Sequence, residues 1–409
     1  MSRKYLPNNY SSVDLDRISY FDPYFLDRYR IVNVPSEGLD GSAIARDKVE
    51  RMLFLQMAES ISIGSASNIF LNYLPLPEAE QQYRDQLFAN RPQWVSMTSP
   101  ERYKSIPEGE QVTPLDKAVA GSESTLTLLQ ELLSKQSPTD KQRILFGYHQ
   151  TEYMRSIAQT LGISYLNNLN FARWAGSKLG LQEFLDKHNL PAIHALTIYS
   201  KDDIFSAIGY LKGLNYKKAV FKVKYSTGGE GHRIIDLSEA AAMPKNGLDQ
   251  LLPKEYKIGD GLILQGWLEE EDIDGMSSLD LIIDENNKCN FIFIKSKFSP
   301  TGRPLEPACY LPIDRSQFEQ FENIRDHIAH AYTQENAYGP HSINLIHPSA
   351  IACKKYGFSN DIPLIHDENP RIGVSKIAHH WISRIKRGEA GTGWVYSKIY
   401  TNTALTFAE

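Results

Sequence analysis

Lysines and glycines of one short segment have the types and the spacing needed to hold phosphate groups. Residues 219–231, AVFKVKYSTGGEG, read as an apolar strand that carries Lys222 and Lys224 and then enters a glycine-rich turn. Alternation along a strand places both lysines on the same face. Gly228, Gly229 and Gly231 let the backbone approach an anion closely and offer it N–H donors. Taken alone, an ordinary hairpin with solvated lysines explains the segment equally well.

A second segment, far downstream, has residues suited to a metal ion and to phosphoryl transfer. Residues 364–376, LIHDENPRIGVSK, begin with an apolar strand and continue into Asp367, Asn369 and Arg371, which alternation places on one side. Carboxylate and amide oxygens suit Mg²⁺ when nucleotide phosphates supply its other ligands. A fixed arginine can neutralise charge that develops during the transfer. The alternative reading is a solvated turn at a proline.

Taken together, the two segments resemble those of the ATP-grasp superfamily, the ligases that activate a carboxylate as an acyl phosphate. The order of the parts is similar as well. The family has a lysine early in its nucleotide-binding half, which corresponds here to Lys178 in NFARWAGSKLGLQEFLDKHNLPA, expected to be a helix. A second lysine precedes the glycine loop, and the spacing favours Lys222 over Lys224. The resemblance covers residues 165–400 and implies ATP and Mg²⁺ as cofactors.

The resemblance also implies a hinge that holds adenine. The matching stretch is ILQGWLEEE, residues 263–271. The carbonyl of Gly266 and the N–H of Leu268 would contact the base, beside Gln265, and Trp267 would supply an apolar face. The acidic run 269–272 reads as a solvated surface, although one of its carboxylates, for which we name Asp272, could reach the ribose hydroxyls.

The metal site departs from the family pattern at one position. Asp367, Asn369 and Arg371 match the family's string of an acid, an asparagine and an arginine at alternate positions. Relatives carry another acid on the preceding strand, where GPHSINLI, residues 339–346, offers Asn344. An amide oxygen can bind a metal but brings no charge. We therefore expect either that Glu368 compensates or that one of two metal sites is weak.

The expected fold class is α/β plus α+β, with three parts. Residues 1–165 alternate strands with helices, lack GxGxxG and GxxxxGK motifs, and predict an open α/β domain with a parallel sheet ahead of the ATP-grasp core. The core comprises residues 166–190 and 262–409, and residues 191–261 form its lid. After the hinge, SSLDLIIDENNKCNFIFIKSKFS predicts an antiparallel hairpin. Lys297 and Arg303 follow it and could hold the carboxylate substrate, although solvated charges at a strand exit are the commoner case.

Composition narrows the class of protein. The chain has 409 residues, of which 42% are hydrophobic and 23% charged, with a net charge of −5, so neither a nucleic-acid nor a membrane partner is expected. The first ten residues lack the apolar core of a secretion signal, and we expect a cytoplasmic protein. Cys289, Cys309 and Cys353 are few and widely spaced, which argues against disulfides and a zinc site.

The function expected from the resemblance is ATP-dependent amide formation. A small-molecule carboxylate would be phosphorylated by ATP and then captured by a small-molecule amine, with Arg371 stabilising the developing charge. The run SSLDLIID is most similar to the amide-forming ligases of peptide and natural-product assembly, among which homodimers are frequent. Two alternatives stay open, a small-molecule kinase and a catalytically weakened nucleotide-binding regulator of the same fold.

Overall fold

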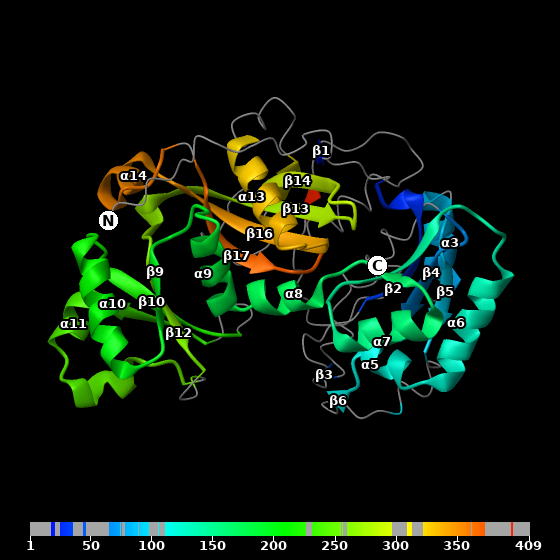
Figure 1. Cartoon of the computed structure of the whole chain (residues 1–409), viewed down its shortest axis with the longest axis horizontal. Helices are drawn as coiled ribbons and strands as arrows, with labels where there is room; N and C mark the ends of the chain where they lie inside the picture. The colour runs from blue at the N-terminus through cyan, green and yellow to red at the C-terminus, as the bar shows by residue number, and fades with distance from the viewer. Residues whose placement is uncertain are drawn as a thin grey trace.

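The computed structural model describes most of the chain between residues 111 and 372 and shorter pieces outside this range. The described residues are 18–20, 25–35, 44–45, 65–73, 75, 78–88, 90–97, 105, 111–225, 231–254, 256, 260–296, 309–312, 322–360, 362–372 and 394–395. Their strands form three sheets of four or more strands and one two-stranded pair. Figure 1 shows the N-terminal sheet at one end of the molecule and the sheet formed by strands within residues 195–266 at the other.

The N-terminal sheet is parallel, as the alternation of strands and helices predicts. Its order is β5 (Gln93–Ser96), β4 (Ile69–Asn72), β2 (Tyr29–Val34), β7 (Gln142–Gly147) and β8 (Ser164–Tyr165). The helices are α3 (Glu78–Leu87), α5 (Leu115–Ala120), α6 (Glu123–Lys135) and α7 (Glu152–Leu161). Leu129 of α6 and Ile157 of α7 are fully buried in one core with Val32 and Leu145 of the central strands. The prediction of an open α/β sheet is confirmed.

The second sheet, which we call the lid sheet, is antiparallel. Its order is β11 (His232–Asp236), β10 (Lys218–Val223), β12 (Leu262–Gly266) and β9 (Ala195–Ile198). Helices α10 (Lys201–Gly213) and α11 (Leu237–Ala242) bury one face of it, where Phe221 and Leu264 pack against Ile204 and Leu237. A 3-10 helix, Lys245–Leu251, follows. Lys222 alternates with Phe221 and therefore belongs to the face away from these helices.

The third sheet, the large sheet, occupies the middle of the molecule (Figure 1). Its order is β17 (Leu364–Asn369), β16 (Gly339–Pro348), β13 (Ile273–Ile283), β14 (Cys289–Ser296), β15 (Cys309–Pro312) and β18 (Trp394–Val395), with β1 (Ile18–Tyr20) parallel to β14. The expected hairpin is β13 with β14. Helices α8 (Leu169–Ala175), α9 (Lys178–Lys187) and α13 (Glu322–Gln334) pack on one face through Phe171, Phe184 and Tyr332. Helix α14 (Ala350–Tyr356) follows β16 and packs with the lid core.

The smaller elements are a two-stranded pair and two short helices. Strands β3 (Ile44–Ala45) and β6 (Gln111–Val112) pair with each other, and 3-10 helices span Phe25–Arg28 and Glu270–Asp272.

The single helix predicted around Lys178 is wrong in one respect, because it is two helices. Helix α8 ends at Ala175, and Ser177 begins α9 by accepting a hydrogen bond from the N–H of Gly180 at 3.0 Å. A Cβ atom at Gly180 would lie 1.9 Å from the carbonyl oxygen of Trp174, so this close turn requires glycine there. The break places Lys178 in the first turn of a helix, beside the large sheet.

Candidate functional site

Lys178 connects three parts of the chain. It is the first residue of α9, and its backbone N–H donates to the carbonyl of Lys224, at the end of lid strand β10, at 2.9 Å. Its ammonium forms an ion pair with Asp367 Oδ1 on β17 of the large sheet. A helix start, the lid sheet and the edge of the large sheet therefore meet at this side chain.

Lys222 is buried in the same place without a partner of its own. Only 4% of the residue is exposed, and burial, followed by the charge of Lys178, lowers its pKa from 10.5 to about 7, while Asp367 opposes the shift. Within the part of the chain that the structure describes, its ammonium makes no hydrogen bond or ion pair. A buried amine with a depressed pKa is costly to keep and is typical of functional sites.

Lys224 does not share this position, contrary to the alternation that we expected. Strand β10 ends at Val223, so the alternation stops one residue earlier. The Lys224 ammonium lies 5.4 Å from the ring centroid of its exposed neighbour, Tyr225. Lys222 is therefore the buried one of the two lysines, and the choice of Lys222 as the phosphate contact stays a prediction.

The turn after β10 is described only at its end. Gly231 has φ +69°, and a Cβ there would lie 2.4 Å from Val223 Cγ2, so both the backbone and the space require glycine. Gly228 and Gly229 lie outside the described residues. His232 follows and pairs with Lys222 across the two strands. Burial, and then the charges of Lys222 and Lys178, lower the pKa of His232 to about 4, so its imidazole is neutral at pH 7.

The predicted metal ligands share one face of the large sheet. Asn344 on β16 lies directly opposite Asp367 on β17, and side chains at such paired positions point the same way. Asn369, two residues beyond Asp367, accepts a hydrogen bond from Arg371 at 3.2 Å. Although burial by itself raises the pKa of Asp367, the charge and hydrogen bond of Lys178 lower it below its usual value. Among the described residues, no group of three or more His, Cys, Asp or Glu side chains could hold a metal.

Glu368 does not compensate for Asn344, so that expectation is wrong. Its carboxylate points to the opposite, helix-covered face, where it accepts from Tyr332 Oη at 2.6 Å and contacts His341 Nδ1 at 2.9 Å. The residue is 2% exposed, and burial raises its pKa although both hydrogen bonds oppose the shift. Alternation along β17 is the reason, because the neighbour of Asp367 must face the other way.

Arg371 meets the N-terminal sheet, a contact that the sequence did not reveal. Its guanidinium lies 5.0 Å from the ring centroid of Tyr148, which follows β7 directly. Burial, and then the charge of Arg371, hold the pKa of the adjacent His149 well below its ordinary value. Ligands of open α/β sheets bind at the carboxyl ends of the strands. The C-terminal end of β7 therefore faces the Arg371 side of the site.

The hinge residues form a packed connection at the C-terminal end of β12, an inner strand of the lid sheet. The backbone N–H of Gly266 donates to the carbonyl oxygen of His194 at 2.9 Å, and that of Trp267 donates to the carbonyl oxygen of Lys218 at 3.0 Å. Gly266 packs against Tyr216, since a Cβ would lie 2.3 Å from that ring. Gln265 is buried, and Leu268 packs in the lid core. Their contacts with adenine stay predictions.

The proposed ribose contact of Asp272 is wrong, and so is the expectation of a solvated surface at this residue. Asp272 is 0% exposed. Its carboxylate accepts from Tyr356 Oη at 2.8 Å, from Lys355 Nζ at 3.3 Å and from the N–H of Glu269 at 3.1 Å. It therefore anchors α14 to the hinge and has no group to offer to a sugar.

The remaining predicted residues, Lys297 and Arg303, lie outside the described residues. Sequence reasoning missed His149, His232 and a further histidine, His366, on β17. Burial, and then the charges of Lys222 and Lys178, lower the pKa of His366 to about 3, while the charge of Asp367 opposes the shift. Its position beside Asp367 was visible in the sequence, but its orientation was not.

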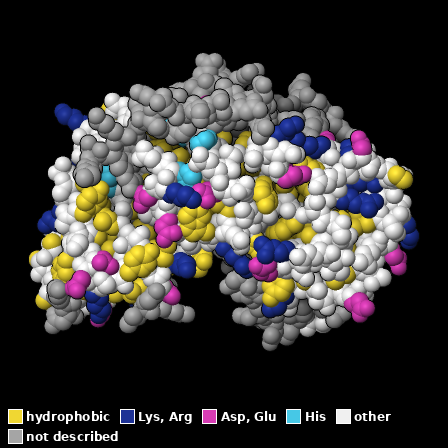
Figure 2. All heavy atoms as spheres, in the orientation of Figure 1, with side chains coloured by type: hydrophobic (Ala, Val, Ile, Leu, Met, Phe, Trp, Pro, Cys, Tyr) yellow, Lys and Arg dark blue, Asp and Glu magenta, His cyan; other side chains and the backbone are white. Residues whose placement is uncertain are grey.

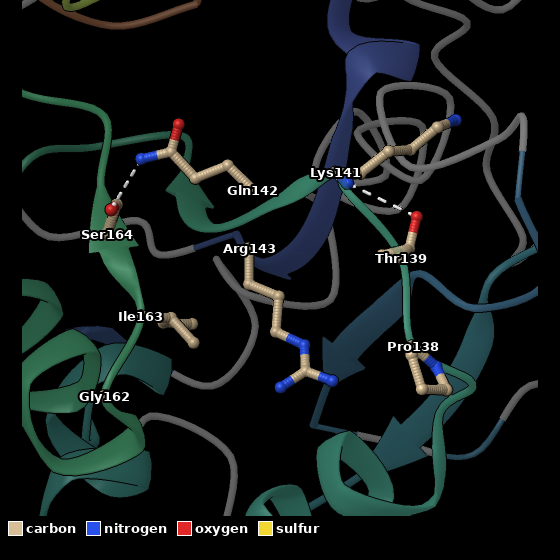
Figure 3. A pocket seen from close by; sticks show the side chains of 8 residues that line it. All are labelled: Pro138, Thr139, Lys141, Gln142, Arg143, Gly162, Ile163 and Ser164. Carbon is tan, nitrogen blue, oxygen red and sulfur yellow. Dashed lines mark hydrogen bonds between the residues drawn. The ribbon is translucent and has the colours of Figure 1, made fainter.

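One surface hollow lies away from these residues. It has a volume of about 400 Å³ and is lined by Pro138, Thr139, Lys141, Gln142, Arg143, Gly162, Ile163 and Ser164 (Figure 3). Gln142 and Ser164 are the first residues of β7 and β8, so it lies at the sheet edge opposite to Tyr148. Arg143 and Lys141 donate to the carbonyls of Leu133 and Asp27.

The surface of the molecule is hollowed between two of its parts. The space-filling view shows a notch between the lid part and the N-terminal part, with Lys and Arg side chains on both of its sides (Figure 2). Among the described residues, no helix is long and apolar enough to cross a membrane.

Comparisons with known proteins give remote structural likenesses. No protein-family model and no curated protein sequence matches the chain. N5-carboxyaminoimidazole ribonucleotide synthetase from Thermus thermophilus has 14% identity and a TM-score of 0.48, over 88% of this chain and 79% of that one. The Staphylococcus aureus N5-carboxyaminoimidazole synthetase complexed with ADP has 11% identity and a TM-score of 0.46, over 84% and 71%. D-cycloserine synthetase has 13% sequence identity and a TM-score of 0.39, over 59% of this chain and 80% of that one. With identities of 11–14% and TM-scores below 0.5, these likenesses carry no inference about the activity of this chain.

Proposed function

We propose that the chain is an ATP-grasp ligase that joins a small-molecule carboxylate to a small-molecule amine at the expense of ATP. One observation carries the proposal, namely that Lys178 of α9, Lys222 of the lid sheet and Asp367 of the large sheet converge although they are far apart in sequence. The buried Lys222 and the partly buried Lys178 beside one carboxylate make the site positive. Such a site suits the phosphates of a nucleotide together with a cation.

The residues around this point take the following roles. Lys178 and Lys222 hold phosphate oxygens. Asp367, Asn369 and Asn344 offer a hard, all-oxygen ligand set with a single carboxylate, which fits Mg²⁺ bound mainly through phosphates. Magnesium, when bound, would neutralise part of the phosphate charge. The division into residues 1–165, a core of 166–190 with 262–409, and a lid of 191–261 is part of the proposal.

The reaction has two steps. A substrate carboxylate oxygen attacks the γ-phosphorus of ATP, the bond to the bridging oxygen of ADP breaks, and an acyl phosphate forms. The amine nitrogen then attacks the acyl carbon, phosphate leaves with the electron pair of the C–O bond, and the amine loses a proton. In this proposal Arg371 stabilises the negative charge in both steps. Its contact with Tyr148 supports a position for the substrate near the carboxyl end of β7.

The decisive experiment follows one oxygen atom. Carboxylic acids labelled with ¹⁸O are incubated with the protein, MgATP and a panel of amines, and the released phosphate is analysed by mass spectrometry. A ligase transfers one carboxylate ¹⁸O to phosphate and requires both substrates for its release. A phosphorylated product without free phosphate would instead show a kinase.

Other results would point to the regulator. Tight MgATP binding without turnover across the whole panel would favour it, and Asn344 in place of an acid is the feature that motivates it. We further propose a cytoplasmic enzyme of small-molecule, natural-product biosynthesis, which turnover of such acids would support.

A further inference from the structure

Strand β17 contains a bulge, and the bulge turns an additional side chain towards the phosphate site. Asn344 of β16 pairs with Asp367, but the next residue, Leu345, pairs with Ile365. His366 is therefore the extra residue between two regular pairs. A β-bulge of this kind re-aims side chains and is common beside active sites.

The neighbours along the strand show the effect of this bulge. Ile365 and Glu368 face the helix-covered core, where Ile365 belongs to the apolar cluster and Glu368 contacts Tyr332. Asp367 faces the site, where it pairs with Lys178. In a regular strand His366 would point away from Asp367. Because the bulge breaks the alternation, His366 lies on the same side as Asp367, where Lys222 and Lys178 act on it electrostatically.

The imidazole of His366 has a buried nitrogen that lacks a hydrogen-bond partner. Nδ1 is inaccessible to water, and no described group bonds to it. A buried polar atom without a partner costs about 1–3 kcal/mol, and such atoms in native structures often mark a ligand contact. Two ammonium groups nearby disfavour a bound cation at this nitrogen and favour an anion.

We propose that His366 is a ligand-contact residue whose Nδ1–H donates a hydrogen bond to a phosphate oxygen of the bound nucleotide. The inference rests on the proposed function. It adds one side chain of β17 to the site formed by Lys178, Lys222 and Asp367. An imidazole Nδ1–H is a hydrogen-bond donor, so this unpartnered atom can bind a phosphate oxygen beside the two lysines. The proposed metal site beside this donor has only one carboxylate, that of Asp367.

The test is nucleotide binding by calorimetry with the full chain and four variants. ADP and adenosine are titrated into the wild type, His366→Leu, His366→Asn, His366→Gln and, as a matched control on α13, His330→Leu. Each titration is done in EDTA and in Mg²⁺. The side-chain nitrogen of asparagine occupies the place of Nδ1, whereas that of glutamine occupies the place of Nε2, so the pair tests the atom and not merely the residue.

The expected result is specific to phosphate. His366→Leu and His366→Gln lose about tenfold or more in ADP affinity, as for a hydrogen bond to a charged group, both in EDTA and in Mg²⁺. His366→Asn and His330→Leu stay within about threefold of the wild type, and adenosine binds all variants equally. If His366→Leu does not fold, the ADP affinities of His366→Asn and His366→Gln test the inference, and equal affinities of the two variants would contradict it.

Four results would overturn the inference. The first is wild-type ADP affinity in His366→Leu, and the second is a loss confined to Mg²⁺, which would make His366 a metal ligand. The third is an equal loss for adenosine, which would show a structural role. The fourth is a wild type that binds neither ADP nor adenosine, which would remove the proposed function itself.

Discussion

Replacing Lys222 by methionine should make the protein more stable and abolish its function. The ammonium is buried, and its pKa falls from 10.5 to about 7 on folding. One pKa unit corresponds to about 1.4 kcal/mol, so the charged form costs up to about 5 kcal/mol in the folded state. Methionine keeps the length of the side chain and removes the charge. We therefore expect Lys222→Met to raise the free energy of unfolding below pH 7 by up to about 5 kcal/mol.

The pH dependence of this gain has a defined sign. Between pH 7 and 10.5 the unfolded chain holds a proton on Lys222 that the folded protein does not, so wild-type stability rises with pH through this window. Below pH 7 both states are protonated and the whole penalty is present. The advantage of Lys222→Met over the wild type should therefore be largest below pH 7 and disappear towards pH 10.5.

Urea unfolding at pH 6, 7, 8, 9 and 10, for wild type and variants, measures this difference. Lys218→Met is the matched control, because Lys218 lies on the same strand but is exposed and pairs with Glu269 at 3.0 Å. Its effect should stay within about 1 kcal/mol at every pH. Calorimetry should show MgATP binding at least about tenfold weaker in Lys222→Met. A variant that is less stable than the wild type at pH 6, or a difference that does not change with pH, would refute the reasoning.

Two further predictions concern the buried polar groups. Because burial holds the pKa of His232 at about 4 and of His366 at about 3, both are neutral when folded, and stability should be lost as the pH falls from 6.5 through 4. In urea unfolding, the double variant His232→Asn, His366→Asn should lose less free energy of unfolding between pH 7 and pH 4 than the wild type does. A pH dependence of stability equal to that of the wild type would contradict the conclusion that both histidines are neutral when folded. Asp272→Asn should lower the free energy of unfolding by about 3 kcal/mol or more, because it removes the negative charge that pairs with Lys355 and replaces one of two buried acceptor oxygens by an amide donor, while ADP affinity stays unchanged. Weaker ADP binding at equal stability would restore Asp272 as a nucleotide contact.

Elements with long periodic patterns could be predicted from the sequence. The β13–β14 hairpin lies where the sequence pattern predicted it, and the N-terminal sheet is parallel, as the alternation of strands and helices in residues 1–165 predicted. The break between α8 and α9 was missed although its signals, Gly176 and Ser177, are local. An apolar pattern continues through the break because both helices pack on the same sheet. Periodicity therefore identified the buried face but not the turn.

The site could be predicted only where motif residues carry it. Lys178, Lys222 and Asp367 were identified from type, order and spacing, and the structure brings them together. His366 could not be placed, because its direction depends on a bulge that only the pairing of β17 with β16 defines. His149 was missed because the approach of Arg371 to this end of β7 depends on how the N-terminal sheet packs against the large sheet.

The most direct test of the central claim is a crystal structure with Mg²⁺ and a non-hydrolysable ATP analogue. The account predicts that Lys178 Nζ and Lys222 Nζ both lie within hydrogen-bond distance of phosphate oxygens, and that the metal contacts Asp367. An analogue bound elsewhere, or a Lys222 side chain directed away from the phosphates, would contradict it.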